Sequence, residues 1–186
     1  MHLSQMPKLL VSFDEGWDEL IHARPTVLRL FALLVLPMSI LPPAMIYYAG
    51  GHYGEIFFHG LTPRHWHVAA LIFFFAELLT VPAMAWIMRL ACRAIDVRAG
   101  YRECFTLAAL APIPMWISSL VLLIPNFAVC IAVGALGLAC SLAITYRGMY
   151  ALFRMHEDLR AMQMATVVTG AGLLAWLVLM QIVLMH

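Results

Sequence analysis

Five long apolar runs dominate the pattern of hydrophobic and polar positions along this chain. Each run is close to the roughly 20 residues that an α-helix needs to cross a hydrocarbon core about 30 Å thick. The polar connections between them are too short to hold a soluble domain. We therefore predict an all-α integral membrane protein with one five-helix membrane domain over residues 26–186. The predicted spans are 26–49, 68–88, 104–124, 126–146 and 164–185.

Residues 1–25 follow a different pattern. Apolar side chains recur there at helical spacing, and acidic side chains lie on the other side. This predicts an amphipathic helix along the membrane interface, with Phe13 and Trp17 as its apolar anchors. Its acidic face is a poor match for anionic lipid. The arginines in the connection between the second and third spans, among them Arg93 and Arg98, are a better partner for this face. A simple interfacial anchor and a partner-docking helix both remain open.

Composition and charge support the membrane assignment and add an orientation. Hydrophobic residues make up 64% of the chain and charged residues 11%, against about 25% charged in soluble proteins. Of the 11 Lys and Arg residues, only Arg64 falls on one side of the predicted membrane domain. The positive-inside rule then places the amino terminus in the cytoplasm, and five spans place the carboxyl terminus outside. A net charge of +1 gives no basic field for nucleic acid.

Prolines interrupt three of the apolar runs. Each proline removes a backbone donor and crowds the preceding turn, so we expect kinks or breaks there. Carbonyl groups freed at membrane depth need neighbouring protein or a wet cavity. The interruptions therefore indicate either helix shape and packing or a functional cavity. The prolines are Pro37, Pro42, Pro43, Pro82, Pro112 and Pro114.

Glu77 is the strongest candidate for a functional residue. It lies roughly 13 Å from the outer end of its span, at 1.5 Å per residue. An ionised side chain near the bilayer centre costs several kcal/mol, so Glu77 should be protonated, paired or hydrated and should face the bundle interior. One hypothesis is a proton- or cation-responsive group in a cavity shaped by Thr80, Pro82 and the first-span prolines. The other is a structural glutamic acid that hydrogen-bonds a kinked helix.

Histidines gather in the connection between the first two spans. Imidazole is a suitable ligand for zinc, copper or nickel, and a His-x-His pair with one further histidine could supply three ligands. The spacing matches no strong metal motif, and a collar of histidines at headgroup level is the alternative. No other cofactor is indicated. The residues concerned are His52, His59, His65 and His67.

The fourth span carries small residues at helical spacing: Ala128, Ala132, Ala135 and Ala139. Small residues let helix backbones approach closely in lipid, where packing replaces the hydrophobic drive. This stripe predicts a helix-packing face, either within the bundle or in a dimer.

Catalytic motifs are absent from the sequence. There is no G-x-S-x-G elbow, no P-loop and no H-E-x-x-H pattern, so we predict that the chain is not an enzyme. Two classes of function remain open. One is a non-enzymatic membrane scaffold that acts on lipid organisation, on a partner membrane protein or on a second copy of itself. The other is a small permease or channel for ions or small solutes that uses Glu77 and the broken helices.

Three stretches of the sequence carry a family resemblance. They are the proline-bearing Leu107-Ala-Ala-Leu-Ala-Pro-Ile-Pro114, the short turn at Pro125, and Tyr146-Arg-Gly-Met-Tyr-Ala-Leu-Phe-Arg-Met-His156. With the order of the spans, they resemble the Yip (Ypt/Rab-interacting protein) domain family, and its bacterial inner-membrane branch most closely.

The resemblance implies a five-helix protein of the bacterial cytoplasmic membrane. For the eukaryotic branch it implies roles in vesicle trafficking with Rab-type GTPases and in membrane shaping. This chain lacks the Asp-Leu-Tyr-Gly-Pro type of cytoplasmic motif found in that branch, so the resemblance does not carry GTPase binding over. For the bacterial branch it supplies no settled activity.

Overall fold

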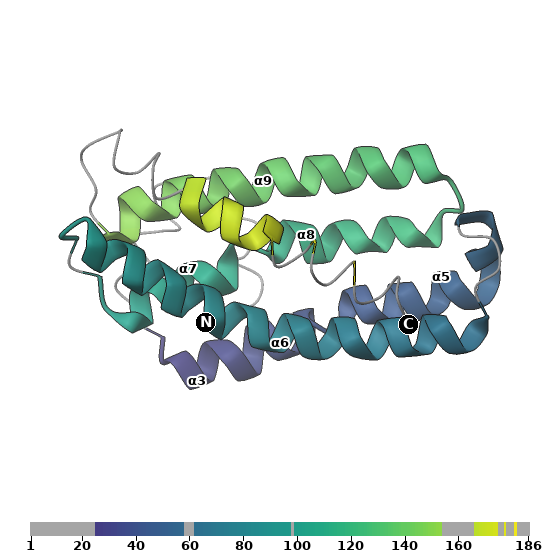
Figure 1. Cartoon of the computed structure of the whole chain (residues 1–186), viewed down its shortest axis with the longest axis horizontal. Helices are drawn as coiled ribbons and strands as arrows, with labels where there is room; N and C mark the ends of the chain where they lie inside the picture. The colour runs from purple at the N-terminus through teal and green to yellow at the C-terminus, as the bar shows by residue number, and fades with distance from the viewer. Residues whose placement is uncertain are drawn as a thin grey trace.

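The structure, a computed structural model, is built of helices joined by short turns, with no strand in the part that it describes. It describes residues 25–57, 62–97, 99–153, 166–174, 177 and 181, with the backbone alone for 55–57 and 63. The elements shown in Figure 1 are α3 (Val27–Leu30), the π-helix η2 (Phe31–Val35), α4 (Leu36–Met38), α5 (Leu41–Phe57), α6 (Pro63–Ala94), α7 (Tyr101–Leu110), α8 (Ile113–Ser118), the 3-10 helix η3 (Ser119–Leu123) and α9 (Phe127–Phe153).

In the described part of the chain four helical segments are long and apolar enough to cross a membrane, which confirms four of the predicted spans. Each helical segment runs past its predicted apolar stretch at one end or both. The predicted fifth span, 164–185, is described only in part, and the predicted helix in residues 1–25 lies outside the described residues. The four segments are Val27–Gly54, Arg64–Ala94, Tyr101–Leu123 and Phe127–Phe153.

The segments form a bundle whose long axis follows the helices, with α7 and α8 lying between α6 and α9 (Figure 1). Helix α5 packs along α6, α6 along α7, and α8 along α9. The connection from α5 to α6 lies at the same end of the bundle as the turn from η3 to α9 (Figure 1). We call this the α5–α6 end. The other end carries most of the described arginines: Arg29, Arg89, Arg93, Arg102 and Arg147.

The core is centred on α7. Every residue from Cys104 to Leu110 is buried, which leaves this short helix surrounded by its neighbours. Met88 of α6 and Met149 of α9 belong to the same cluster. Large apolar side chains also cover the outside of the bundle, with Leu79 of α6 70% exposed. An apolar exterior of this kind is stable against lipid and not against water, which agrees with the membrane assignment.

Two of the predicted proline interruptions are breaks. The first span passes through η2 and α4 into a turn at residues 39–40, and Pro42 and Pro43 then lie buried in the first turn of α5. The third span breaks between α7 and α8, where Pro112 is the N-cap residue and Pro114 lies in the first turn of α8. Proline fits such first-turn positions because its missing N–H has no helical partner there.

Pro82 behaves differently. Helix α6 continues as one α-helix through Pro82, so of the kink or break expected there the structure shows no break. Long membrane helices tolerate an internal proline when neighbouring groups compensate for the lost hydrogen bond. The Thr80 hydroxyl, which donates to the Ala76 carbonyl oxygen at 2.6 Å, supplies an additional bond in the turn before it.

Candidate functional site

Glu77 lies on α6, where the bundle partly buries it. The buried Trp116 side chain of α8, 2% exposed, donates a hydrogen bond to the Glu77 carboxyl group. The second carboxyl oxygen, Oε2, is buried and has no hydrogen-bond partner among the described residues. Glu77 thus faces the bundle interior, as expected for an acidic side chain at this depth.

Two serine hydroxyls are also buried without a hydrogen-bond partner in the described part of the chain. Ser39 Oγ lies at the break between α4 and α5, in a residue with 0% exposure, and Ser141 Oγ lies on α9. A buried hydroxyl without a partner costs about 1–3 kcal/mol, so such groups are uncommon without a reason. With Glu77 Oε2 they make three buried side-chain oxygens without a hydrogen-bond partner among the described residues.

The register of the helices places Ser39 near the depth of Glu77. In the antiparallel pair of α5 and α6, Tyr47 lies opposite His67, with ring centroids 4.6 Å apart. Ser39 is about eight residues before Tyr47, which puts it within about 3 Å of Glu77 along the bundle axis. The candidate site is therefore one layer of the bundle at the level of the first-span break.

The sequence reasoning named Glu77 and missed Ser39, Ser141 and Trp116. A polar residue just before the Pro42–Pro43 pair is a signal for Ser39, because a break exposes groups that an intact helix would satisfy. Nothing in the sequence marks Trp116 as the neighbour of Glu77, since the two are brought together only by the packing of α8 against the rest of the bundle.

The other residues predicted for this site are distributed as follows. Pro42, Pro43, Pro112 and Pro114 lie at the two breaks. Thr80 adds no free hydroxyl to the layer, because its hydroxyl already donates to the carbonyl oxygen of Ala76 on its own helix.

Of the histidines predicted as metal ligands, His52 and His65 have hydrogen-bond partners close by on the chain, and His67 stacks on Tyr47 of α5. His52 Nδ1 lies 2.9 Å from the Tyr48 carbonyl oxygen, and the two rings stack. His65 Nδ1 accepts from the Thr62 N–H at 3.2 Å and lies 2.7 Å from its hydroxyl oxygen, closing the first turn of α6. Among the described residues no three His, Cys, Asp or Glu side chains are placed to hold a metal ion. His59 lies outside them, so a metal site that includes it stays a prediction.

Trp66 fixes the α5–α6 end of the bundle. A Cβ atom on Gly50 would come within 2.5 Å of Trp66 Cβ, and one on Gly54 within 2.6 Å of Trp66 Nε1. The indole thus fills the space left by a Gly-x-x-x-Gly pair on α5, a pattern that allows close helix contact in membranes. This contact positions His67, the next residue on α6, against α5.

The predicted small-residue stripe of α9 does not pack within the described bundle. Ala128, Ala132, Ala135 and Ala139 are all exposed. Helix α9 packs with the opposite side, where Gly137 meets the Ser118 side chain and the Pro114 carbonyl oxygen of α8. Both interpretations of the stripe, a contact within the five-helix bundle and a dimer contact, stay predictions.

The residues predicted for an interface at the arginine-rich end are only partly described. Arg93 lies exposed in the last turn of α6, while Phe13, Trp17 and Arg98 lie outside the described residues. The predicted contact between the amino-terminal segment and these arginines therefore stays a prediction.

One comparison with known proteins identifies the family. A family model for the Yip1 domain matches residues 8–179, nearly the whole chain. No curated protein and no solved structure matches. The order of the membrane helices, the proline break before Trp116 and the match over this length agree with the resemblance seen in the sequence. This integral membrane protein is a member of the Yip1 domain family.

Proposed function

We propose that this protein is a non-enzymatic membrane scaffold that organises a partner membrane protein, with a second copy of the same chain as the simplest partner. The observation that carries the proposal is the exposed small-residue stripe on α9. Its four alanines turn about 170° away from Gly137, at 100° per residue, and so face away from α8. Such a face permits close approach of another membrane helix.

The remaining features fit this function. Large apolar side chains surround the bundle, so its outer faces meet lipid and other membrane helices. The proposal extends to the placement of the chain in the membrane. Helical spacing supports an interfacial helix over residues 1–25, the apolar runs support a five-span domain over residues 26–186, and the arginine pattern supports a cytoplasmic amino terminus and an external carboxyl terminus. The family resemblance supports a bacterial inner membrane. The acidic face of the first segment and the arginines at the opposite end of the bundle from Trp66 would form the cytoplasmic partner surface.

A cysteine-crosslinking experiment tests the helix-packing face. Single cysteines are placed at Ala139 and, at nearly the same depth, at Leu138, which is 37% exposed and lies about 100° away around α9. Both variants lack the native cysteines and are oxidised in native membranes. We expect a disulfide-linked dimer from Ala139→Cys and little from Leu138→Cys. Equal yields from both positions, or none from either, would contradict the proposed face.

A small permease is the second candidate, and one observation favours it. Glu77, Ser39 and Ser141 carry buried oxygens without partners close to two helix breaks. In transporters, broken helices with unsatisfied polar groups form sites for ions and small solutes. The two candidates differ in whether water reaches Glu77.

A further inference from the structure

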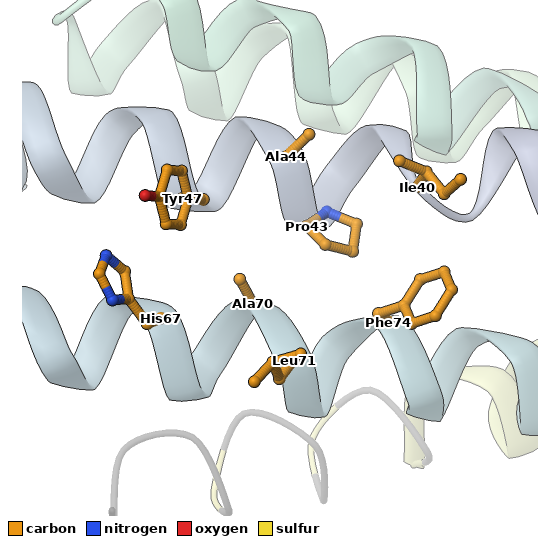
Figure 2. A pocket seen from close by; sticks show the side chains of 8 residues that line it. All are labelled: Ile40, Pro43, Ala44, Tyr47, His67, Ala70, Leu71 and Phe74. Atoms are coloured by element: carbon orange, nitrogen blue, oxygen red, sulfur yellow. The ribbon is translucent and has the colours of Figure 1, made fainter.

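A groove of about 510 Å³ runs along the outside of the bundle between α5 and α6. Figure 2 shows its walls as two facing stretches of these helices, with Ile40 and Phe74 at one end and Tyr47 and His67 at the other. Between these ends the wall is formed by small or apolar side chains, among them Ala44 and Ala70. The lining extends over residues 40–47 and 67–74, and seven steps of 1.5 Å along each stretch make the groove about 10 Å long.

The two ends of the groove differ in polarity. The Tyr47 hydroxyl and the His67 imidazole are the polar groups of the lining, and their rings stack at 4.6 Å with planes 20° apart. Both residues are exposed, and both lie close to the ends of the predicted apolar spans 26–49 and 68–88, where the bilayer changes from hydrocarbon to headgroups. An apolar trough with a polar mouth at that level matches the shape and polarity of one lipid molecule.

A positive charge stands beside the mouth. Arg64 is exposed and lies one helical turn before His67, so the two side chains are neighbours on the surface of α6. It is the one Lys or Arg that the described residues place at the α5–α6 end. A guanidinium group binds phosphate oxygens through paired hydrogen bonds, and a tyrosine hydroxyl and an imidazole can add further bonds.

We propose that this groove binds an anionic glycerophospholipid, with one acyl chain between Ala44 and Phe74 and the phosphate against Arg64 and His67. No residue of α9 lines the groove, and neither does Glu77, so the groove adds lipid recognition to the scaffold function. The stacked pair of Tyr47 and His67 sets the width of the mouth. Trp66, seated on Gly50 and Gly54, holds the two helices at the spacing that leaves the groove open.

Native mass spectrometry of the full-length protein, purified in detergent and stripped of lipid, tests the site. The probes are dioleoyl phosphatidylglycerol and, as the zwitterionic match, dioleoyl phosphatidylcholine. Ala44→Trp fills the groove at an exposed position, and Ala83→Trp makes the same change at an exposed position of α6 outside it. We expect at least tenfold weaker phosphatidylglycerol binding in Ala44→Trp and unchanged binding in Ala83→Trp. Equal binding by both variants would overturn the proposal.

A second variant tests the headgroup contact without altering the groove. Arg64→Gln should reduce the preference for phosphatidylglycerol over phosphatidylcholine about fivefold. A preference that stays the same as in the unaltered chain would overturn the assignment of the phosphate to Arg64. A photoreactive residue at Leu71 gives an independent readout in native membranes, where the proposal requires crosslinks to lipid. Crosslinks to another part of this chain or to a second copy would show that protein fills the groove.

Discussion

The Arg102 side chain donates a hydrogen bond of 2.8 Å from its Nε to the main-chain carbonyl oxygen of Pro25, 77 residues earlier in the chain. This bond joins the start of the first span to the start of α7 at the arginine-rich end. Pro25 precedes the N-cap residue Thr26, so the bond holds the chain as it enters the membrane. It therefore couples the central helix of the core to the start of the first span.

Replacing Arg102 by lysine should destabilise the protein by about 1–2 kcal/mol, because lysine keeps the charge and loses the Nε–H donor that reaches Pro25. The thermal unfolding midpoint in detergent measures the effect. Arg93→Lys is the matched control, since Arg93 lies exposed at the same end. Equal midpoints for the two variants would show that the Arg102 bond adds nothing to stability.

Gly50→Ala and Gly54→Ala should each destabilise the bundle by about 1–3 kcal/mol, the usual cost of overpacking. The new methyl group would meet the Trp66 side chain near its Cβ in the first variant and at its indole nitrogen in the second. Gly51→Ala is the control, because a Cβ there meets nothing within 4 Å. A Gly51 variant as unstable as the other two would contradict the proposed packing of Trp66 against Gly50 and Gly54.

Gly137→Ala should destabilise the contact between α8 and α9 by about 1–2 kcal/mol. Its Cβ would lie 2.9 Å from Ser118 Cβ and 3.2 Å from the Pro114 carbonyl oxygen, a backbone atom that cannot turn aside. Gly134→Ala adds the same methyl group where nothing lies within 4 Å, so its unfolding midpoint should stay or rise. If Gly134→Ala had the lower unfolding midpoint of the two variants, the assignment of the Gly137 side of α9 as its packing side would be wrong.

Asp96→Gly should stabilise the protein by about 0.5–1 kcal/mol. Asp96 has a φ of 56°, and the bonds from Asp96 N to Arg93 O and from Val97 N to Cys92 O close α6 in a Schellman motif. Glycine adopts this left-handed conformation without strain. Ala94→Gly, at the last residue of α6, should destabilise by up to about 1 kcal/mol because glycine weakens a helix. A lower midpoint for Asp96→Gly would count against this explanation.

Much of the fold follows from local properties of the sequence. Four spans could be located because each apolar run must satisfy its backbone bonds internally, and the breaks at Pro42 and Pro112 follow from the missing proline N–H. Pro82 was the exception, since whether a helix tolerates an internal proline depends on its neighbours.

The candidate site was harder to predict because it depends on which helix faces meet. An acidic residue deep within an apolar run was enough to select Glu77. Its neighbour Trp116 and the unpartnered Ser39 come from other parts of the chain. An apolar pattern shows that a helix is surrounded by lipid or protein, but it does not show which helix packs against which face. The same limit applies to the small-residue stripe of α9, for which the sequence left two locations open.

The scaffold proposal requires that no water path reaches Glu77, and labelling of this residue tests that requirement most directly. A carboxyl-reactive carbodiimide is applied to native membranes over a range of pH, with and without a soluble nucleophile, and Glu77→Gln serves as the control. We expect no labelling at Glu77 that the nucleophile intercepts at any pH. Interceptable labelling that is lost in Glu77→Gln would show that water enters the bundle, and the permease would then be the better account.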